Sequence, residues 1–184
     1  MADSQLSAPT RLTTRRLVLR RPVDADEADL VALDRATDVL DYLVKRGADA
    51  SQIEARVRAR IAAGAAEPEA RYGWWVIESS DGTFHGRGLL APLWQGADDI
   101  EVGVYLRKSS RGKGFAREAA EALLDYAFFD LALPRVVGVL VRRDSPAKKL
   151  LTHLRMSPKG KVVLYGVEAD RWALTANGWL PRRR

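Results

Sequence analysis

The chain has 184 residues, no cysteine and two histidines, and its 30 basic and 24 acidic side chains give a net charge of +6. This length is typical of one domain that buries roughly 70% of its unfolded surface; we place that domain at residues 11–184, after a disordered tail at 1–10. The missing cysteines exclude disulfides, thiolate metal sites and a cysteine nucleophile, and with two histidines we expect no metal.

The excess positive charge limits the classes of partner. A basic surface is typical of proteins that bind nucleic acid, anionic membranes or anionic ligands. Part of the excess comes from Arg182–Arg184, and no nucleic-acid-binding motif is present, so nucleic acid is disfavoured as a partner. The sequence has no run of 18 apolar residues and no signal-peptide pattern, so we expect neither a membrane partner nor secretion. The resulting expectation is a cytoplasmic protein.

Hydrophobic periodicity gives the expected elements in chain order. The capping-box spacing of Asp24 with Glu27, and of Ser51 with Glu54, predicts two helix starts. The pattern predicts a strand around 17–20, helices over 24–45 and 51–64, strands over 72–78, 87–93 and 100–106, a helix from 114 to Pro134, a strand over 135–141, a helix over 146–154, and strands over 161–167 and 171–175.

The most informative segment is Arg111-Gly112-Lys113-Gly114-Phe115-Ala116, between an alternating strand and an amphipathic helix. The first turn of a helix has unpaired N–H groups, and glycine lets a ligand come close, so we predict a phosphate or pyrophosphate site. The segment lacks the Walker A spacing, and Arg117 stands where a Rossmann loop has its third glycine. A plain connecting turn would need only one glycine.

This segment resembles the pyrophosphate loop Arg/Gln-x-x-Gly-x-Gly/Ala of the GNAT acetyltransferases. Ile100 to Arg107 resembles the fourth strand of the RimJ/RimL-type branch, and Thr14 to Arg20 resembles its opening strand. The resemblance covers roughly residues 10–180. It implies an α/β (α+β) fold with a central, mixed, mostly antiparallel, seven-stranded sheet flanked by about four helices.

The resemblance also implies an activity: direct transfer of an acetyl group from acetyl-CoA to a primary amine. The acceptor would be the N-terminal α-amine of a protein or peptide, or a small amine. A homodimer is compatible with the resemblance, although no sequence feature decides it. The expected coenzyme-binding residues are Val102, Val104, Tyr105, Leu106, Arg111, Gly112, Lys113, Gly114, Phe115, Ala116 and Asp144.

Glu101 is the candidate general base. An acceptor amine must lose a proton, and an α-amine (pKa about 8) does so more easily than a lysine (about 10.4), by roughly 3 kcal/mol. Glu101 shares a strand face with Gly103 and Tyr105, opposite an apolar face, and a carboxylate beside a cleft can accept the proton directly or through water. The alternatives are a solvent-facing strand glutamate and a structural ion pair.

The general acid is less clear, because the chain departs from the pattern of the branch. Asp144 stands where relatives carry a pantetheine-binding asparagine, and Ala147 and Leu151 stand where relatives carry an acidic hydroxyl. Tyr165 or Ser145 could supply a hydroxyl instead, although Ser145 also fits a helix cap. Two hypotheses follow: an enzyme with a weak acid, or a non-catalytic acyl-CoA-binding module or sensor.

Three carboxylates are candidates for binding the acceptor. Asp34, Asp38 and Asp41 are spaced to share one face of the helix predicted over 24–45. Such a face would attract a cationic acceptor, or it is an ordinary solvated helix face.

Overall fold

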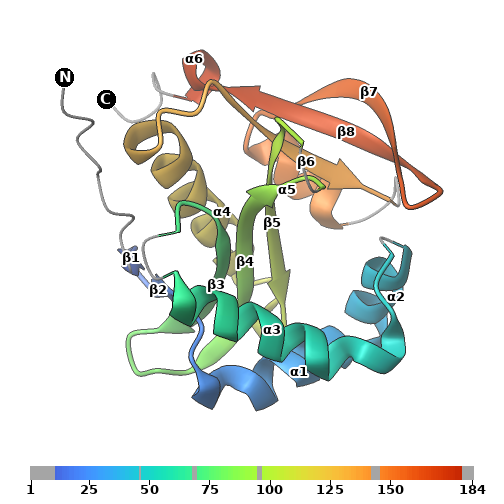
Figure 1. The fold of residues 1–184 in the computed structure, drawn as a ribbon. Coiled ribbons are helices and arrows are strands. Elements are labelled where there is room, and N and C mark those ends of the chain that lie inside the picture. The colour runs from blue at the N-terminus through green and yellow to red at the C-terminus, as the bar shows by residue number, and fades with distance from the viewer. Residues whose placement is uncertain (1–10, 46, 68–69, 95–96, 142–145, 180–184) are drawn as a thin grey trace.

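One sheet of eight strands, in the order β1-β2-β3-β4-β5-β6-β8-β7, organises the computed structural model (Figure 1). The structure describes residues 11–45, 47–67, 70–94, 97–141 and 146–179. The strands are β1 (Arg11–Thr13), β2 (Leu17–Arg20), β3 (Gly73–Ser79), β4 (Phe84–Pro92), β5 (Ile100–Leu106), β6 (Arg135–Leu140), β7 (Ser157–Leu164) and β8 (Val167–Thr175). Neighbouring strands are antiparallel except β5 and β6, which are parallel.

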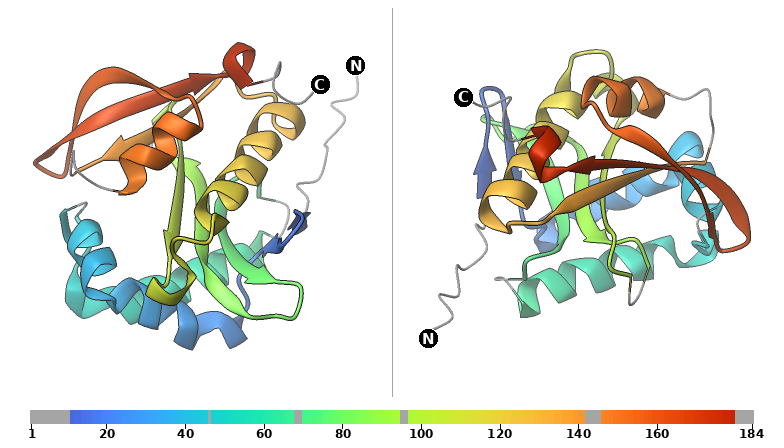
Figure 2. Two further views of the ribbon diagram at one scale, coloured as in Figure 1. Left: turned by 180° about the vertical axis from the view of Figure 1, so that it is seen from behind. Right: turned by 90° about the horizontal axis from the view of Figure 1, so that it is seen from above.

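Helices cover both faces of the sheet (Figures 1 and 2). The α-helices are α1 (Glu27–Arg35), α2 (Thr37–Lys45), α3 (Ile53–Ala66), α4 (Phe115–Asp125), α5 (Pro146–His153) and α6 (Ala176–Trp179). Short 3-10 turns lie at η1 (Asp24–Asp26), η2 (Ala50–Gln52) and η3 (Lys108–Ser110), and a π turn, η4 (Tyr126–Asp130), extends α4. Alternation along the strands divides the core: one face packs on α4 and α5, and the other on α1, α2 and α3.

The sheet therefore has one strand more than the seven predicted, and the described chain has more helices than the predicted four. The added strand is β1, which is three residues long and too short to give a periodicity of its own. The mixed, mostly antiparallel α/β architecture that the sequence predicted is confirmed.

The helix predicted over 24–45 is interrupted. Its first turn is a 3-10 turn, where the Asp26 carboxylate, rather than Glu27, accepts a hydrogen bond from the Val23 N–H. At Ala36 the backbone becomes extended (ψ 129°), and α2 starts anew with Thr37 and an acidic first turn. The apolar periodicity continues across this break and conceals it. At the next helix start the observed cap is Asp49, whose carboxylate accepts from Ser51, so the predicted role of Ser51 as the cap is wrong.

The strand predicted over 161–167 in fact contains a hairpin turn. Leu164 pairs with Val167, and the two residues between them, Tyr165 and Gly166, have φ of 51° and 80°. Two positive φ values in a two-residue loop are typical of a type I′ turn, whose twist suits a hairpin. The sequence Tyr-Gly is an unusual signal for this turn because tyrosine rarely adopts positive φ.

Candidate active site

β5 and β6 separate at the centre of the sheet. Their registered pairing within the described residues consists of Glu101 with Val137 alone. The Arg107 N–H donates to the His85 carbonyl (3.0 Å), which fixes the alternation of hydrogen bonds between β4 and β5. By that alternation the N–H groups of Val104 and Leu106 are directed away from β4, towards the gap beside β6. The gap therefore presents backbone donors to an extended ligand.

The glycine loop ends at the first turn of α4. Gly112 and Gly114 have φ of 74° and 81°, values that side chains rarely allow, and α4 begins at Phe115 without a side-chain cap. A Cβ at Gly114 would lie 3.1 Å from Nη2 of Arg16. The first N–H groups of α4 are thus left for another acceptor, which is the arrangement of a helix N-terminal anion site.

Arg111 joins this loop to both neighbouring parts of the site. Its guanidinium donates from Nε (3.0 Å) and Nη2 (2.8 Å) to the Leu106 carbonyl, and Nη1 lies 2.6 Å from a carboxylate oxygen of Asp38 on α2. Burial opposes the charge of Asp38, but the Arg111 hydrogen bond and charge together lower its pKa. Asp38 is therefore not part of a free acidic helix face.

His85 contacts the residues at both ends of the glycine loop. Its Nδ1 lies 2.9 Å from the hydroxyl of Ser110, and its ring packs against that of Phe115, with centroids 4.6 Å apart and planes tilted by 38°. Burial, followed by the nearby cations Arg107 and Lys113, lowers the pKa of His85. The neutral imidazole thus contacts both ends of the glycine loop.

Glu101 lies in a cavity of about 460 Å³ on the opposite face of the sheet from α4. It is only 5% exposed, so it is not the solvent-facing strand glutamate that was one alternative. Tyr105 and Tyr165 line the same cavity, together with residues of α3 and of the loop before it. The structure therefore brings together Glu101 and Tyr165, two of the three residues that the sequence suggested for proton transfer.

Tyr165, at the tip of the β7–β8 hairpin, lines one side of this cavity, and Figure 1 shows this tip near α2. Tyr165 is 67% exposed, yet its ring lies directly over Gly47, where an added Cβ would come within 2.6 Å of the ring. Gly47 itself has a φ of 82°. The β7–β8 hairpin thereby meets Gly47, in the segment between α2 and α3.

A buried charge network supports the floor of the cavity. The fully buried Arg87 donates from Nε to Asp34 (3.0 Å), and its guanidinium lies 4.1 Å from the ring centroids of both Trp74 and Tyr105. Asp34 also accepts from Arg56 at 3.0 Å. The interpretation of Asp34 as a surface carboxylate is therefore wrong. The helix pattern could not reveal this, because its buried partner is on β4.

The other predicted coenzyme residues fall into three groups. Val102, Val104 and Leu106 lie on β5, next to its gap with β6. The side chain of Tyr105 lies on the Glu101 face and packs on Tyr42, with the two ring centroids 5.8 Å apart. Asp144 lies outside the described residues, as do Ser145 and the predicted tail at 1–10. The residues of the loop and the α4 start are Arg111, Gly112, Lys113, Gly114, Phe115 and Ala116.

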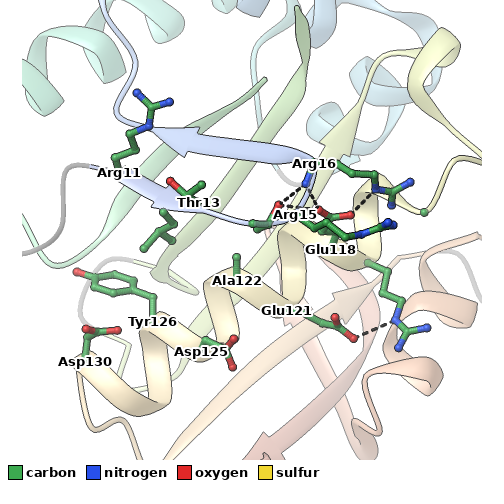
Figure 3. A pocket seen from close by; sticks show the side chains of 14 residues that line it. Arg11, Thr13, Arg15, Arg16, Glu118, Glu121, Ala122, Asp125, Tyr126 and Asp130 are labelled. Atoms are coloured by element: carbon green, nitrogen blue, oxygen red, sulfur yellow. Dashed lines mark hydrogen bonds and ion pairs between the residues drawn. The ribbon is translucent and has the colours of Figure 1, made fainter. Parts of the chain in front are cut away.

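A larger cavity, about 730 Å³, lies between the β1–β2 turn and α4 (Figure 3). Two of its acidic side chains already have partners: Glu118 accepts from Thr14, from the Arg16 N–H and from Arg16 Nε, and Glu121 pairs with Arg117. Glu101 does not line it. We interpret this region as the attachment of β1 to α4, and the smaller cavity as the site of the chemistry.

One protein-family model matches most of the chain. The model described as "Acetyltransferase (GNAT) domain" matches residues 16–157. Within the described chain, no helix is long and apolar enough to cross a membrane.

Two curated relatives match over part of their length. The "Uncharacterized N-acetyltransferase p20" of Bacillus licheniformis is 38% identical over 60 residues, which are 33% of this chain and 34% of the relative. The "Probable N-acetyltransferase YjcK" of Bacillus subtilis is 27% identical over 113 residues, 59% of this chain and 62% of the relative. The chain thus matches less than two thirds of the length of either relative.

Solved structures share the fold over nearly the whole chain. RimJ of Mycobacterium smegmatis, in complex with CoA-disulfide, superposes with a TM-score of 0.69 at 21% identity, covering 91% of this chain and 86% of that one. The ribosomal-protein-S5-alanine acetyltransferase of Vibrio fischeri gives a TM-score of 0.71 at 14% identity, covering 93% and 99%.

Proposed function

The chain belongs to the GNAT acetyltransferase family, and from this premise we propose that it transfers an acetyl group from acetyl-CoA directly to a primary amine. The acceptor is an N-terminal α-amine of a protein or peptide, or a small amine. The observation that carries this proposal is the position of Glu101, a buried carboxylate in a cavity beside the gap between β5 and β6.

The chain offers a fitting donor set for acetyl-CoA. The N–H groups at the start of α4, with Arg111, would hold the pyrophosphate. The backbone donors of Val104 and Leu106 would bind the pantetheine arm and the thioester carbonyl, where they would stabilise the developing oxyanion. Gly114 keeps the approach to the helix end open, since any side chain there would meet Arg16.

Proton transfer completes the reaction. The amine nitrogen, once it has lost a proton to Glu101 directly or through water, attacks the thioester carbon. The nitrogen then releases its second proton to water, and the carbon–sulfur bond breaks with its electron pair moving to sulfur, which leaves an amide and a thiolate. The thiolate then takes a proton, for which Tyr165 is our candidate donor. A thiol of pKa about 8.5 is a good leaving group, so a weak acid suffices.

The alternative, a non-catalytic acyl-CoA-binding module, is motivated by Leu151. This residue stands at a position of an acid in relatives and is buried against Gly138, whose added Cβ would lie 2.8 Å from it. The helix α5 therefore offers a packing contact at this position instead of a hydroxyl.

One experiment separates these functions. Thermal shift with acetyl-CoA measures binding, and release of free thiol with a panel of peptides and small amines measures turnover. We expect Glu101→Gln to keep acetyl-CoA binding and to lower kcat by about a hundredfold or more. Glu121→Gln, which alters an exposed pair on α4, is the matched control. Binding without turnover in the wild type would favour the module, and full activity in Glu101→Gln would remove Glu101 as the base.

A further inference from the structure

The α3 wall of the Glu101 cavity carries positive charge. Arg56 and Arg60 lie one helical turn apart and both line the cavity. Their guanidinium carbons lie 5.2 and 6.0 Å from the ring centroid of Trp74, which also lines it. Both guanidinium groups therefore lie near the Trp74 indole, in the same part of the cavity wall.

This positive charge is only partly neutralised. Arg56 pairs with Asp34, but the same carboxylate also holds the fully buried Arg87. Arg60 is exposed, and within the described residues it makes no ion pair. Asp34 is thus shared by two guanidinium groups, and Arg60 adds a further positive charge to this wall.

The acidic groups of the cavity lie elsewhere. Asp49 lines it, but its carboxylate accepts hydrogen bonds from the N–H and hydroxyl of Ser51 (2.8 and 2.7 Å) and so caps the turn before α3. Glu101 comes from β5, across from the helix layer. The cavity therefore has a carboxylate on its sheet side and arginines on its α3 side.

We propose, on the basis of the proposed function, that the acceptor carries a carboxylate close to its primary amine, with the amine at Glu101 and the carboxylate at Arg60 and Arg56. Arginine recognises carboxylates with two parallel hydrogen bonds, which gives geometric as well as electrostatic selectivity. The coenzyme phosphates do not need these arginines, because the α4 N-terminus belongs to the opposite face of the sheet.

This proposal reverses the cationic acceptor that the spacing of Asp34, Asp38 and Asp41 suggested. Asp34 is bound to Arg56 and Arg87, and Asp38 is bound to Arg111. Two of the three carboxylates are thus occupied by the protein's own arginines.

Two sources of the carboxylate are tested in parallel. The first arm compares free α-amino acids with the corresponding amino-acid amides. The second compares C-terminally amidated peptides that begin with glutamate with the same peptides beginning with glutamine. We expect the carboxylate member of at least one arm to have a kcat/KM about tenfold or more above its amide, and the arm that responds identifies the source.

Variants of α3 connect this preference to the arginines. Arg60→Ala should raise KM for the carboxylate acceptor about tenfold with little change in kcat, and Arg60→Glu should make the amide the better acceptor. Arg58→Ala is the control, because Arg58 is exposed on the same helix, pairs with Glu27 and does not line the cavity. Equal kcat/KM values within both arms, or an unchanged preference in Arg60→Ala, would overturn the proposal.

Calorimetric titration of the same acceptors in the presence of CoA separates this proposal from the proposed function. If no amine turns over, the proposed function fails, and binding decides the carboxylate site on its own. Carboxylate binding that is lost in Arg60→Glu but kept in Arg58→Ala would support the site. Absence of binding, or equal binding in all variants, would overturn it.

Discussion

His85 illustrates how a single side chain couples the sheet to the coenzyme loop. Its ring lies between Ser110 and Phe115, at either end of the glycine loop, and its pKa is held down by burial and by Arg107 and Lys113. A protonated imidazole here would be buried beside the positive charges of Arg107 and Lys113, and both burial and repulsion disfavour it. The imidazole is therefore held in its neutral form.

This lowered pKa predicts a pH dependence of stability. Above the ordinary value of 6.5, His85 is neutral in both states; as the pH falls below it, the unfolded chain takes up a proton before the folded one does. Stability linked to His85 is thus full above pH 6.5 and is lost on acidification towards the folded pKa. We expect urea midpoints between about pH 7.5 and 5.5 to fall more steeply for the wild type than for His85→Asn.

The control for this titration is His153→Asn, since His153 is exposed on α5. Asp81 favours the charged form of His85, so it acts against the shift, but the net direction remains downward. Parallel pH profiles for the wild type and His85→Asn would contradict the prediction.

At the scale of elements, the conformation of the unit from β5 to α4 depends most directly on the glycines of the loop between them. A substitution Gly114→Ala places a methyl group at φ 81° and 3.1 Å from Arg16. We expect a loss of about 1 kcal/mol in unfolding free energy and an acetyl-CoA affinity lower by about tenfold. Calorimetry and urea unfolding measure the two effects.

Gly82→Ala provides a matched control for this loop variant. Gly82 has the same φ of 81°, but an added Cβ would meet nothing within 4 Å. It should show the same backbone cost and unchanged acetyl-CoA affinity. Equal affinities for the two variants would mean that the glycine loop is not the phosphate site.

The same unit shows which features the sequence could predict. The bounds of β5, 100–106, follow from alternation, and the glycine loop and the start of α4 follow from local chemistry, so all were predicted closely. The break at Ala36 and the pairing of Asp34 with Arg87 depend on contacts between distant segments. For the same reason the sequence analysis missed Arg56 and Arg60, which become a pair facing a cavity only when α3 lies over Trp74.

At the scale of the whole molecule, the cavity is assembled from segments far apart in the chain. Glu101 comes from the middle of the sheet, Arg56 and Arg60 from α3, and Tyr165 from the last hairpin. The contact of Tyr165 with Gly47 brings the last hairpin against the helices of the N-terminal part (Figure 2). Closure of the acceptor side therefore depends on one turn whose conformation tyrosine adopts at a cost.

Tyr165 has two potential roles, a wall and an acid, and two substitutions separate them. Tyr165→Phe keeps the ring over Gly47 but removes the hydroxyl, so loss of the acid should lower kcat about tenfold while leaving KM unchanged. Tyr165→Ala also removes the wall and should raise the acceptor KM as well. Steady-state kinetics with saturating acetyl-CoA give both constants. If Tyr165→Phe behaves as the wild type and Tyr165→Ala raises only KM, the tyrosine is a wall alone, and water at the gap between β5 and β6 must protonate the thiolate.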